Sequence, residues 1–127
     1  MCGGLSILGD VWKSEAYTLA QYINREKEII PNNIISKPPS AELRPNQSDA
    51  DELPDYSALD PFLKEVIEGR KTLKTSTTTT LSKEEKERVY GLVERAEWKR
   101  FQTPPVLRIS HKAFGSGRRI PIVKRRS

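Results

Sequence analysis

Residues 37–45 read KPPSAELRP, and the rest of the chain is arranged around this proline-rich stretch. Its three prolines, Pro38, Pro39 and Pro45, fix their own φ angles, remove backbone donors and favour extended backbone at the residues before them. Ser40 is expected to cap one short helical turn, with its hydroxyl at the positive end of that turn. This hydroxyl, the backbone N–H groups and two nearby cations form a candidate anion site, and a rigid surface loop with a capped turn is the alternative.

The composition limits what the chain can be. Its 127 residues are 35% hydrophobic and 31% charged, which fits one small domain with a thin core. No run is long and apolar enough to cross a bilayer and no secretory signal is indicated, so we expect a cytoplasmic location. The only cysteine and histidine are Cys2 and His111, which favours a reducing compartment and argues against a zinc site or a histidine-based dyad.

The net charge of +5 is unevenly distributed. Nine of the 22 basic residues follow Glu97, and no acidic residue does, so 13 basic residues face 17 acidic ones in the rest of the chain. Residues 103–127 therefore form a basic tail, with a short extended segment expected at residues 106–110. The tail could dock on the acidic remainder, bind a nucleotide phosphate or contact nucleic acid. Aromatic residues are scarce in it, so the stacking surface of a single-strand binder is missing.

Hydrophobic periodicity predicts a first helix over about residues 11–24, with Asp10 as its N-terminal cap. Its apolar face would consist of Trp12, Ala16, Leu19, Ala20 and Ile23. Lys13 lies in the first turn, where a cation is unfavourable with the helix dipole, so its presence indicates an anion that it must meet. The alternative is an ordinary pairing with a neighbour four residues away on a solvated face.

Two further helices are expected. One covers about residues 57–68 and ends at Gly69, and the other covers about residues 82–99 and begins with a capping box of Ser82 and Glu85. Their buried faces would consist of Leu59, Phe62, Leu63, Val66 and Ile67 in the former, and of Val89, Leu92, Val93 and Ala96 in the latter. Together with the first helix, these segments make a mainly α chain with long loops.

Two segments have no regular period. Residues 31–56 are expected to form a lid-like loop, because long aperiodic segments in small domains are typically binding loops, lids or disordered. The acidic cluster of Asp49, Asp51 and Glu52 in this loop could bind Mg²⁺ through hard oxygen ligands, or it could be a solvated flank. Residues 70–81 contain a threonine-rich tract with few apolar side chains, which predicts a flexible linker.

Four stretches resemble the glutamine-dependent NAD synthetases in the same order along the chain. They are GGLSILGDVWKSEAY at residues 3–17, KPPSAELRP with the acidic segment after it, EWKRFQTPP at residues 97–105 and HKAFGSGRRIPI at residues 111–122. The resemblance is to the C-terminal part of these enzymes. It implies that residues 1–127 are the C-terminal portion of an NAD synthase (ligase) domain, and that they complete an α/β, Rossmann-like adenine nucleotide α-hydrolase (ATP-pyrophosphatase) fold.

The resemblance also implies a reaction. Members of this family use ATP and Mg²⁺ to convert the carboxylate of deamido-NAD into an adenylate, and ammonia from glutamine then displaces AMP. The ammonia comes from a separate N-terminal glutaminase domain. Lys13 and Ser40 match positions that bind the ATP phosphates, whereas Lys99 and Arg100 match a basic pair that contacts deamido-NAD. The acidic cluster of the lid-like loop would then lie near the metal.

Some family features are missing or altered. The Ser-Gly-Gly-x-Asp-Ser loop that binds ATP does not occur, and neither does a glutaminase triad. Trp98 and Gly4 stand where the ammonia-dependent relatives have histidine and aspartate. We therefore expect the chain alone not to make NAD, but to act with an N-terminal part in a homo-oligomeric parent enzyme that needs neither membrane nor nucleic acid. The rival hypothesis is a small basic interaction module that binds RNA or anionic surfaces through its tail.

Overall fold

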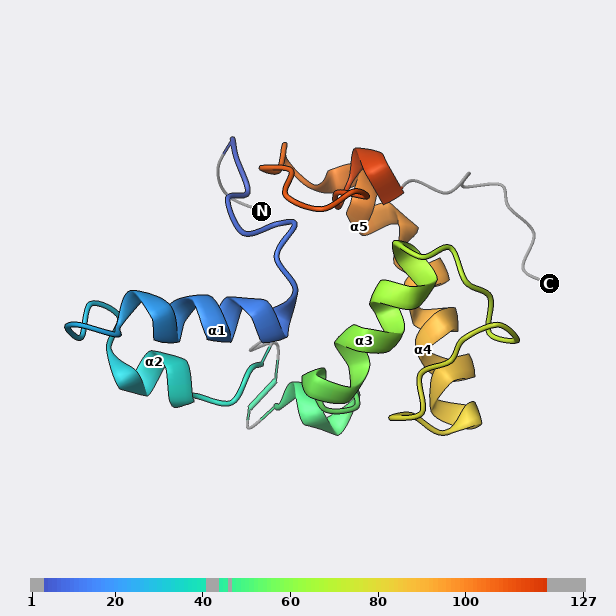
Figure 1. Cartoon of the computed structure of the whole chain (residues 1–127), viewed down its shortest axis with the longest axis horizontal. Coiled ribbons are helices and arrows are strands. Elements are labelled where there is room, and N and C mark those ends of the chain that lie inside the picture. Colours follow the sequence, from blue (N-terminus) through green and yellow to red (C-terminus); the bar gives the residue numbers. More distant parts are fainter. Residues whose placement is uncertain (1–3, 41–43, 46, 119–127) are drawn as a thin grey trace.

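The computed structural model describes residues 4–40, 44–45 and 47–118, and these residues are mainly helical. The elements are α1 (Lys13–Ile23), α2 (Asn32–Ser36), α3 (Tyr56–Ile67), α4 (Lys83–Arg95) and α5 (Glu97–Gln102), with the short 3₁₀ helices η1 (Asp49–Asp51) and η2 (Ser116–Arg118). Over these ranges there is no strand. Figure 1 shows α1 and α2 on one side, α3 and α4 on the other, and α5 above them. The prediction of a mainly α chain with long loops is confirmed.

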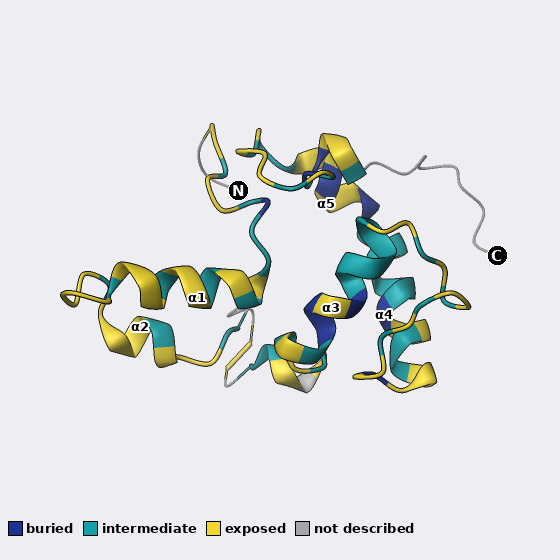
Figure 2. Cartoon of the chain, viewed as in Figure 1, coloured by how far each residue is buried: buried dark blue, intermediate teal, exposed yellow. Residues whose placement is uncertain are grey.

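The core lies between α3 and α4. It consists of Leu59 and Phe62 from α3, Leu81 before α4 and Val89 within α4, and Phe62 is completely buried. In Figure 2 buried residues are seen on α3, α4 and α5, while α1 and α2 are largely exposed. Neither α1 nor α2 contributes a buried residue. The predicted apolar face of the first helix therefore does not join this core.

Capping side chains close in the sequence determine where α3 and α4 begin. The carboxylate of Asp55 caps α3 by accepting the N–H of Ser57 at 2.7 Å. The predicted capping box begins α4, because the Ser82 N–H donates to Glu85 Oε2 at 2.8 Å and the Glu85 N–H donates to Ser82 Oγ at 3.2 Å. The single helix predicted over residues 82–99 is divided, since Ala96 leaves the helical conformation between α4 and α5.

Asp10 does not cap α1, so that prediction is wrong. Trp12 occupies the N-cap position, and the Asp10 carboxylate, which is 2% exposed, turns toward the segment after α5. It accepts the N–H groups of Ile109 at 2.9 Å, Ser110 at 2.7 Å and Phe114 at 3.0 Å. Burial works against the charged form of Asp10, but these donors outweigh it and hold the pKa of the carboxyl below its usual value.

Residues 4–10 pack against the same distant segment. Ser6 forms an isolated parallel bridge with Val106, and its N–H donates to the carbonyl oxygen of Pro105 at 2.8 Å. Gly9 permits this approach, because a Cβ atom at position 9 would lie 2.4 Å from Val106 Cγ1. The extended segment predicted at residues 106–110 thus forms one bridge rather than a strand.

One carboxylate of α3 accepts several hydrogen bonds from the threonine-rich tract, and the Thr80 hydroxyl donates to the carbonyl oxygen of Ala58 at 3.0 Å. Glu65 accepts hydrogen bonds from Lys71 Nζ at 2.8 Å, Ser76 Oγ at 2.8 Å and the N–H groups of Thr77 and Thr78 at 3.0 and 3.2 Å. Lys71 and the hydroxyl donors hold the pKa of Glu65 well below its usual value. Residues 70–80 have no helix but are in contact with the rest of the protein, through these polar bonds and through Leu73, which packs against the core.

The predicted lid-like loop, residues 31–56, contains α2 and η1 and ends in the first residue of α3. The helical turn predicted after Ser40 falls on residues 41–43, which lie outside the described residues. In the part of the chain that the structure describes, no helix combines the length and the apolar character needed to cross a bilayer.

Candidate functional site

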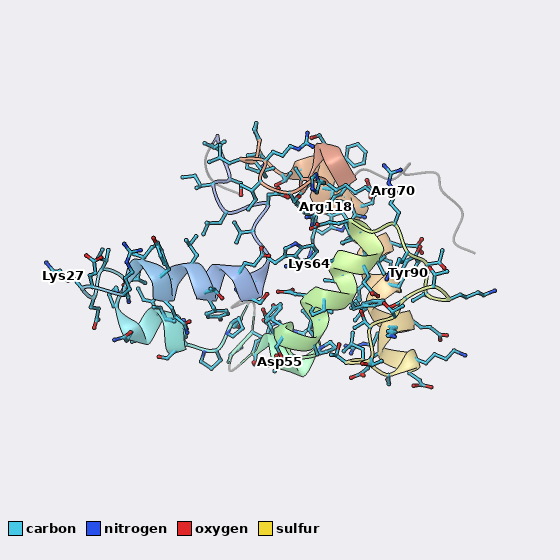
Figure 3. The ribbon with its side chains drawn as sticks, in the orientation of Figure 1. Lys27, Asp55, Lys64, Arg70, Tyr90 and Arg118 are labelled. Atoms are coloured by element: carbon cyan, nitrogen blue, oxygen red, sulfur yellow. The ribbon has the colours of Figure 1, made fainter. Side chains whose placement is uncertain are left out.

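The first turn of α1 lies against one face of α3. The N–H of Ser14 donates to Asp60 Oδ2 at 2.8 Å, and Lys64 Nζ lies 2.5 Å from Glu15 Oε1. Asp60 and Lys64 are four residues apart, so they share a face of α3. Asp60 is only 4% exposed, and its carboxylate satisfies an N-terminal donor of α1 from a neighbouring helix. Figure 3 shows Lys64 between the two helices. α3 therefore fixes the start of α1.

Lys13 extends from this turn toward two aromatic rings. Its Nζ atom lies 5.9 Å from the ring centroid of Tyr17 and 5.8 Å from that of Tyr56. Both distances are within the range of a cation–π interaction. The Lys13 residue remains exposed to solvent. The ammonium is thus oriented by rings on two helices and still accessible to an anion.

Tyr56 also contacts the loop that carries the proline-rich stretch. Its hydroxyl donates to Asp49 Oδ2 at 2.6 Å, and the N–H of Asp49 donates to the carbonyl oxygen of Pro39 at 2.9 Å. Burial, and then the hydrogen bond to Asp49, raise the pKa of Tyr56 well above its usual value. The hydroxyl therefore stays protonated and acts as a donor at neutral pH.

These residues surround a cavity of about 430 Å³ between α1, the start of α3 and the loop. Its lining includes Ser14, Tyr17, Pro38, Pro39, Asp49 and Tyr56. Ser40 directly follows the lining residue Pro39 and is half-buried. The structure therefore brings the first turn of α1, which carries Lys13, to the same cavity as the proline-rich stretch.

The acidic cluster does not assemble a metal site from the described residues. The Asp49 carboxylate is bonded to Tyr56, and the carbonyl oxygen of Glu52 accepts a hydrogen bond from Arg88. The side chain of Asp51 lies outside the part that the structure describes. Among the described side chains, no three histidine, cysteine, aspartate or glutamate residues are grouped so that they could hold an ion. The described side chains of this cluster therefore form no group of three ligands around an ion.

The second predicted pair, Lys99 and Arg100, lies on α5 beside another cavity. Lys99 is exposed, and its Nζ atom is 5.6 Å from the ring of Trp98. Arg100 is 5% exposed, forms an ion pair with Glu97 at 2.6 Å and donates through Nη2 to the carbonyl oxygen of Val93 at 2.8 Å. Arg100 lines a largely apolar cavity of about 460 Å³ that runs between α3 and α4. The two predicted pairs thus lie at different cavities, and Tyr56 lines both.

The described part of the basic tail docks on the body of the protein. The guanidinium of Arg118 lies 3.4 Å from Asp10 Oδ1 and 4.8 Å from the ring of Trp12, and its Nε donates to the Lys112 carbonyl oxygen at 2.6 Å. Burial lowers the pKa of Arg118, and Asp10 opposes that effect. In Figure 3 the labelled Arg118 lies above α3. This agrees with the first of the three alternatives for the tail, and residues 119–127 lie outside the described residues.

Sequence reasoning alone did not assign roles to Tyr56 and Asp60. A tyrosine and an aspartate four residues apart, on a helix whose other face is apolar, form a polar stripe that could have indicated a contact with another element. The partner of that stripe could not be predicted, because α1 lies more than 30 residues earlier in the chain.

Comparisons with known proteins agree over nearly the whole chain. The family model of NAD synthase matches residues 1–103. The chain is 40% identical over 124 residues to the glutamine-dependent NAD(+) synthetase of Synechocystis sp. and 44% identical over 125 residues to that of Acinetobacter baylyi. These alignments cover 98% and 97% of this chain but 22% and 23% of the relatives. The chain therefore spans about a fifth of the length of these relatives.

A solved structure of a synthetase of the same kind also matches this chain. The glutamine-dependent NAD⁺ synthetase from Acinetobacter baumannii, in complex with adenosine diphosphate, matches with a TM-score of 0.51 and 33% sequence identity. The match covers 89% of this chain and 19% of that chain. The resemblance inferred from four sequence stretches is thus confirmed by a family model, by curated relatives and by a structure, and the chain belongs to the NAD synthase family.

Proposed function

We propose that this chain is the C-terminal portion of the ligase domain of a glutamine-dependent NAD synthase. The whole enzyme would amidate deamido-NAD to NAD through an adenylate intermediate, with ATP as co-substrate and ammonia released from glutamine. The observation that carries the proposal is one cavity lined both by Ser14, which follows Lys13 in the first turn of α1, and by Pro38 and Pro39 of the proline-rich stretch. The ADP named for the Acinetobacter baumannii synthetase supports nucleotide binding.

In this proposal Lys13 and Ser40 contact the phosphates of ATP. When the carboxylate of deamido-NAD attacks the α-phosphorus, negative charge moves onto the departing pyrophosphate. An oriented ammonium and a hydroxyl donor stabilise that charge more strongly than the charge of the ground state. The two rings beside Lys13 keep its ammonium in one direction, so little reorganisation is needed when the charge develops. Because the described side chains form no group of three ligands around an ion, no step is assigned to the metal.

Lys99 and Arg100 would contact deamido-NAD. The exposed ammonium of Lys99 is accessible to an anionic substrate. Arg100 uses Nε and Nη2 for Glu97 and Val93, so its contact with the substrate would come from Nη1. Both residues would face substrate bound in the complete enzyme, in which this helical portion completes a Rossmann-like α/β fold and the subunits form a homo-oligomer.

The proposal is tested by a chimera of a full-length relative. The C-terminal fifth of the Acinetobacter baylyi synthetase is replaced by this chain, and NAD formation from deamido-NAD, ATP and glutamine is measured. We expect an active chimera, and no NAD from the 127 residues alone. Lys13→Met should lower kcat/KM for ATP by roughly 10²-fold, the order found when one stabilising donor is removed.

Lys27→Met is the matched control, because Lys27 is an exposed lysine in the turn after α1 (Figure 3). Lys27→Met should leave the kcat/KM of the chimera for ATP unchanged. A folded but inactive chimera would contradict the ligase assignment, and a chimera that tolerates Lys13→Met as well as Lys27→Met would remove the phosphate role of Lys13. NAD formation by the isolated chain would show that the remaining four-fifths is not required.

A further inference from the structure

Tyr56 lies where the two parts of the candidate phosphate site meet. Its hydroxyl is bonded to Asp49 in the loop at 2.6 Å, and its ring is 5.8 Å from the ammonium of Lys13. One planar side chain with two rotatable angles therefore makes both contacts. A change in the angle of the ring would disturb both of them together.

Asp49 is bonded to several parts of the loop through its backbone as well as to Tyr56 through its carboxylate. Its N–H donates to the carbonyl oxygen of Pro39 at 2.9 Å, and its own carbonyl oxygen accepts the N–H groups of Glu52 and Leu53 at 3.1 and 2.8 Å. The carboxylate of Asp49 joins this bonded part of the loop to Tyr56. Loss of the Tyr56 contact would therefore loosen the backbone that carries Pro39 and the residue after it, Ser40.

The position of Tyr56 relative to α1 is also fixed. Tyr56 is the first residue of α3, and Asp60, one turn later, holds the N–H of Ser14 at 2.8 Å. Lys13 precedes Ser14 in the chain, so this contact sets the positions of the Tyr56 and Lys13 backbones relative to each other. It does not set the direction of the Tyr56 ring, whose hydroxyl is bonded to Asp49.

We propose that Tyr56 is a positioning residue that couples Pro39 and Asp49 of the lid-like loop to the ammonium of Lys13. When this part of the loop is bonded through Asp49, the ring keeps the ammonium of Lys13 beside it. When that bond is lost, the ring turns and the ammonium moves away. The inference rests on the proposed function only in taking Lys13 as the phosphate ligand. The protonated state of the Tyr56 hydroxyl at neutral pH supports it, because only the protonated form can donate to Asp49.

The test uses the full 127-residue chain without ligand. Tyr56→Phe keeps the ring and removes the hydroxyl, and Asp49→Ala removes the acceptor from the loop side. Tyr90→Phe is the matched control, because it makes the same chemical change on α4, and Asp49 is bonded to the hydroxyl of Tyr56 instead; Figure 3 labels Tyr90 on α4 and Asp55 at the start of α3. Hydrogen exchange reports on the loop amides. The NMR chemical shift of the Lys13 ε-methylene group reports on how close the group lies to the aromatic rings. The ring currents move this chemical shift away from the usual lysine value.

We expect Tyr56→Phe to speed exchange of the Asp49 and Leu53 amides roughly tenfold, since a hydrogen bond to a charged acceptor is lost. Both Tyr56→Phe and Asp49→Ala should also move the Lys13 signal toward its position in Tyr56→Leu. Tyr90→Phe should change neither measurement. If the loop loosens while the Lys13 signal stays at its wild-type position, the two contacts are independent and the coupling is refuted. Unchanged loop exchange in Tyr56→Phe would refute it as well.

Addition of pyrophosphate separates this inference from the proposed function. In the wild-type chain, pyrophosphate should shift the Lys13 signal and slow exchange in the loop. If it does neither while the ligand-free variants behave as expected, Lys13 is not a phosphate ligand but the coupling stands. If pyrophosphate shifts the Lys13 signal equally in wild type and in Tyr56→Phe and leaves loop exchange unchanged in both, the phosphate role stands and the coupling fails.

Discussion

Replacing Asp10 by asparagine should destabilise the protein although the side chain keeps its shape. Oδ2 accepts the N–H groups of Ile109 and Ser110, and Oδ1 accepts the N–H of Phe114 and faces the guanidinium of Arg118. The NH₂ group of asparagine must replace one of these oxygens. In place of Oδ2 it meets two donors that lose their acceptor, and in place of Oδ1 it meets three, because the Ser110 hydroxyl also donates to Oδ1 at 3.0 Å. At about 1–3 kcal/mol for each unsatisfied donor, the loss of two donors costs roughly 2–6 kcal/mol of unfolding free energy.

Urea unfolding followed by tryptophan fluorescence measures this loss. Glu26→Gln is the matched control, because it makes the same change of charge on a side chain that is 82% exposed, and it should stay within about 0.5 kcal/mol of wild type. Because the pKa of Asp10 is lowered in the folded state, its stabilisation is complete above the unfolded value, roughly pH 4. The difference between wild type and Asp10→Asn should therefore shrink as the pH falls below about 4.

The reasoning is refuted if Asp10→Asn costs no more than Glu26→Gln at pH 7. It is also refuted if the difference between wild type and Asp10→Asn persists unchanged in acid, where protonation should already have weakened the wild-type contacts. Hydrogen exchange gives an independent check, since the amides of Ile109, Ser110 and Phe114 should exchange faster in the variant.

Three further predictions follow from the packing. Phe62→Ala should cost about 3–5 kcal/mol in urea unfolding, because Phe62 is completely buried between α3 and α4, and a cost below 1 kcal/mol would contradict that placement. Glu97→Ala should cost about 3 kcal/mol in the same assay, because it leaves the buried guanidinium of Arg100 unpaired, and an unchanged midpoint would show that the ion pair is exposed in solution. Glu65→Gln should speed tryptic cleavage after Lys74, since the tract loses the carboxylate that binds it, and an equal cleavage rate would show that Glu65 does not order the tract.

The helices with local signals could be predicted from the sequence. Apolar periodicity predicted a helix over residues 57–68, where α3 spans Tyr56–Ile67, and the capping box at Ser82 correctly predicted the start of α4. These signals act between residues a few positions apart, so the sequence contains them in full. The break at Ala96 was missed because alanine favours helix, and no local residue type indicates an interruption there.

The contacts that order the loops could not be predicted, because their partners are far apart in the sequence. The local rule assigned Asp10 to the nearest helix, whereas its donors lie about 100 residues later. The threonine-rich tract has few apolar residues, and its contacts with α3, made chiefly through the Glu65 carboxylate, join residues up to 22 positions apart. In the candidate site, the resemblance indicated Lys13, but only the structure showed that Tyr56 lies between it and the loop.

The hydrogen bonds that Asp10 accepts from residues 109–118 affect the order in which parts of the protein fold during synthesis. The donors follow Asp10 by 99 to 108 positions, so these bonds cannot all form until residue 118 has left the ribosome. The α3 and α4 pair, whose core residues are at most about 30 positions apart, can fold earlier. Residues 4–10 must therefore stay undocked while about 100 further residues are synthesised, and a pause before residue 118 would prolong their exposure to chaperones and proteases.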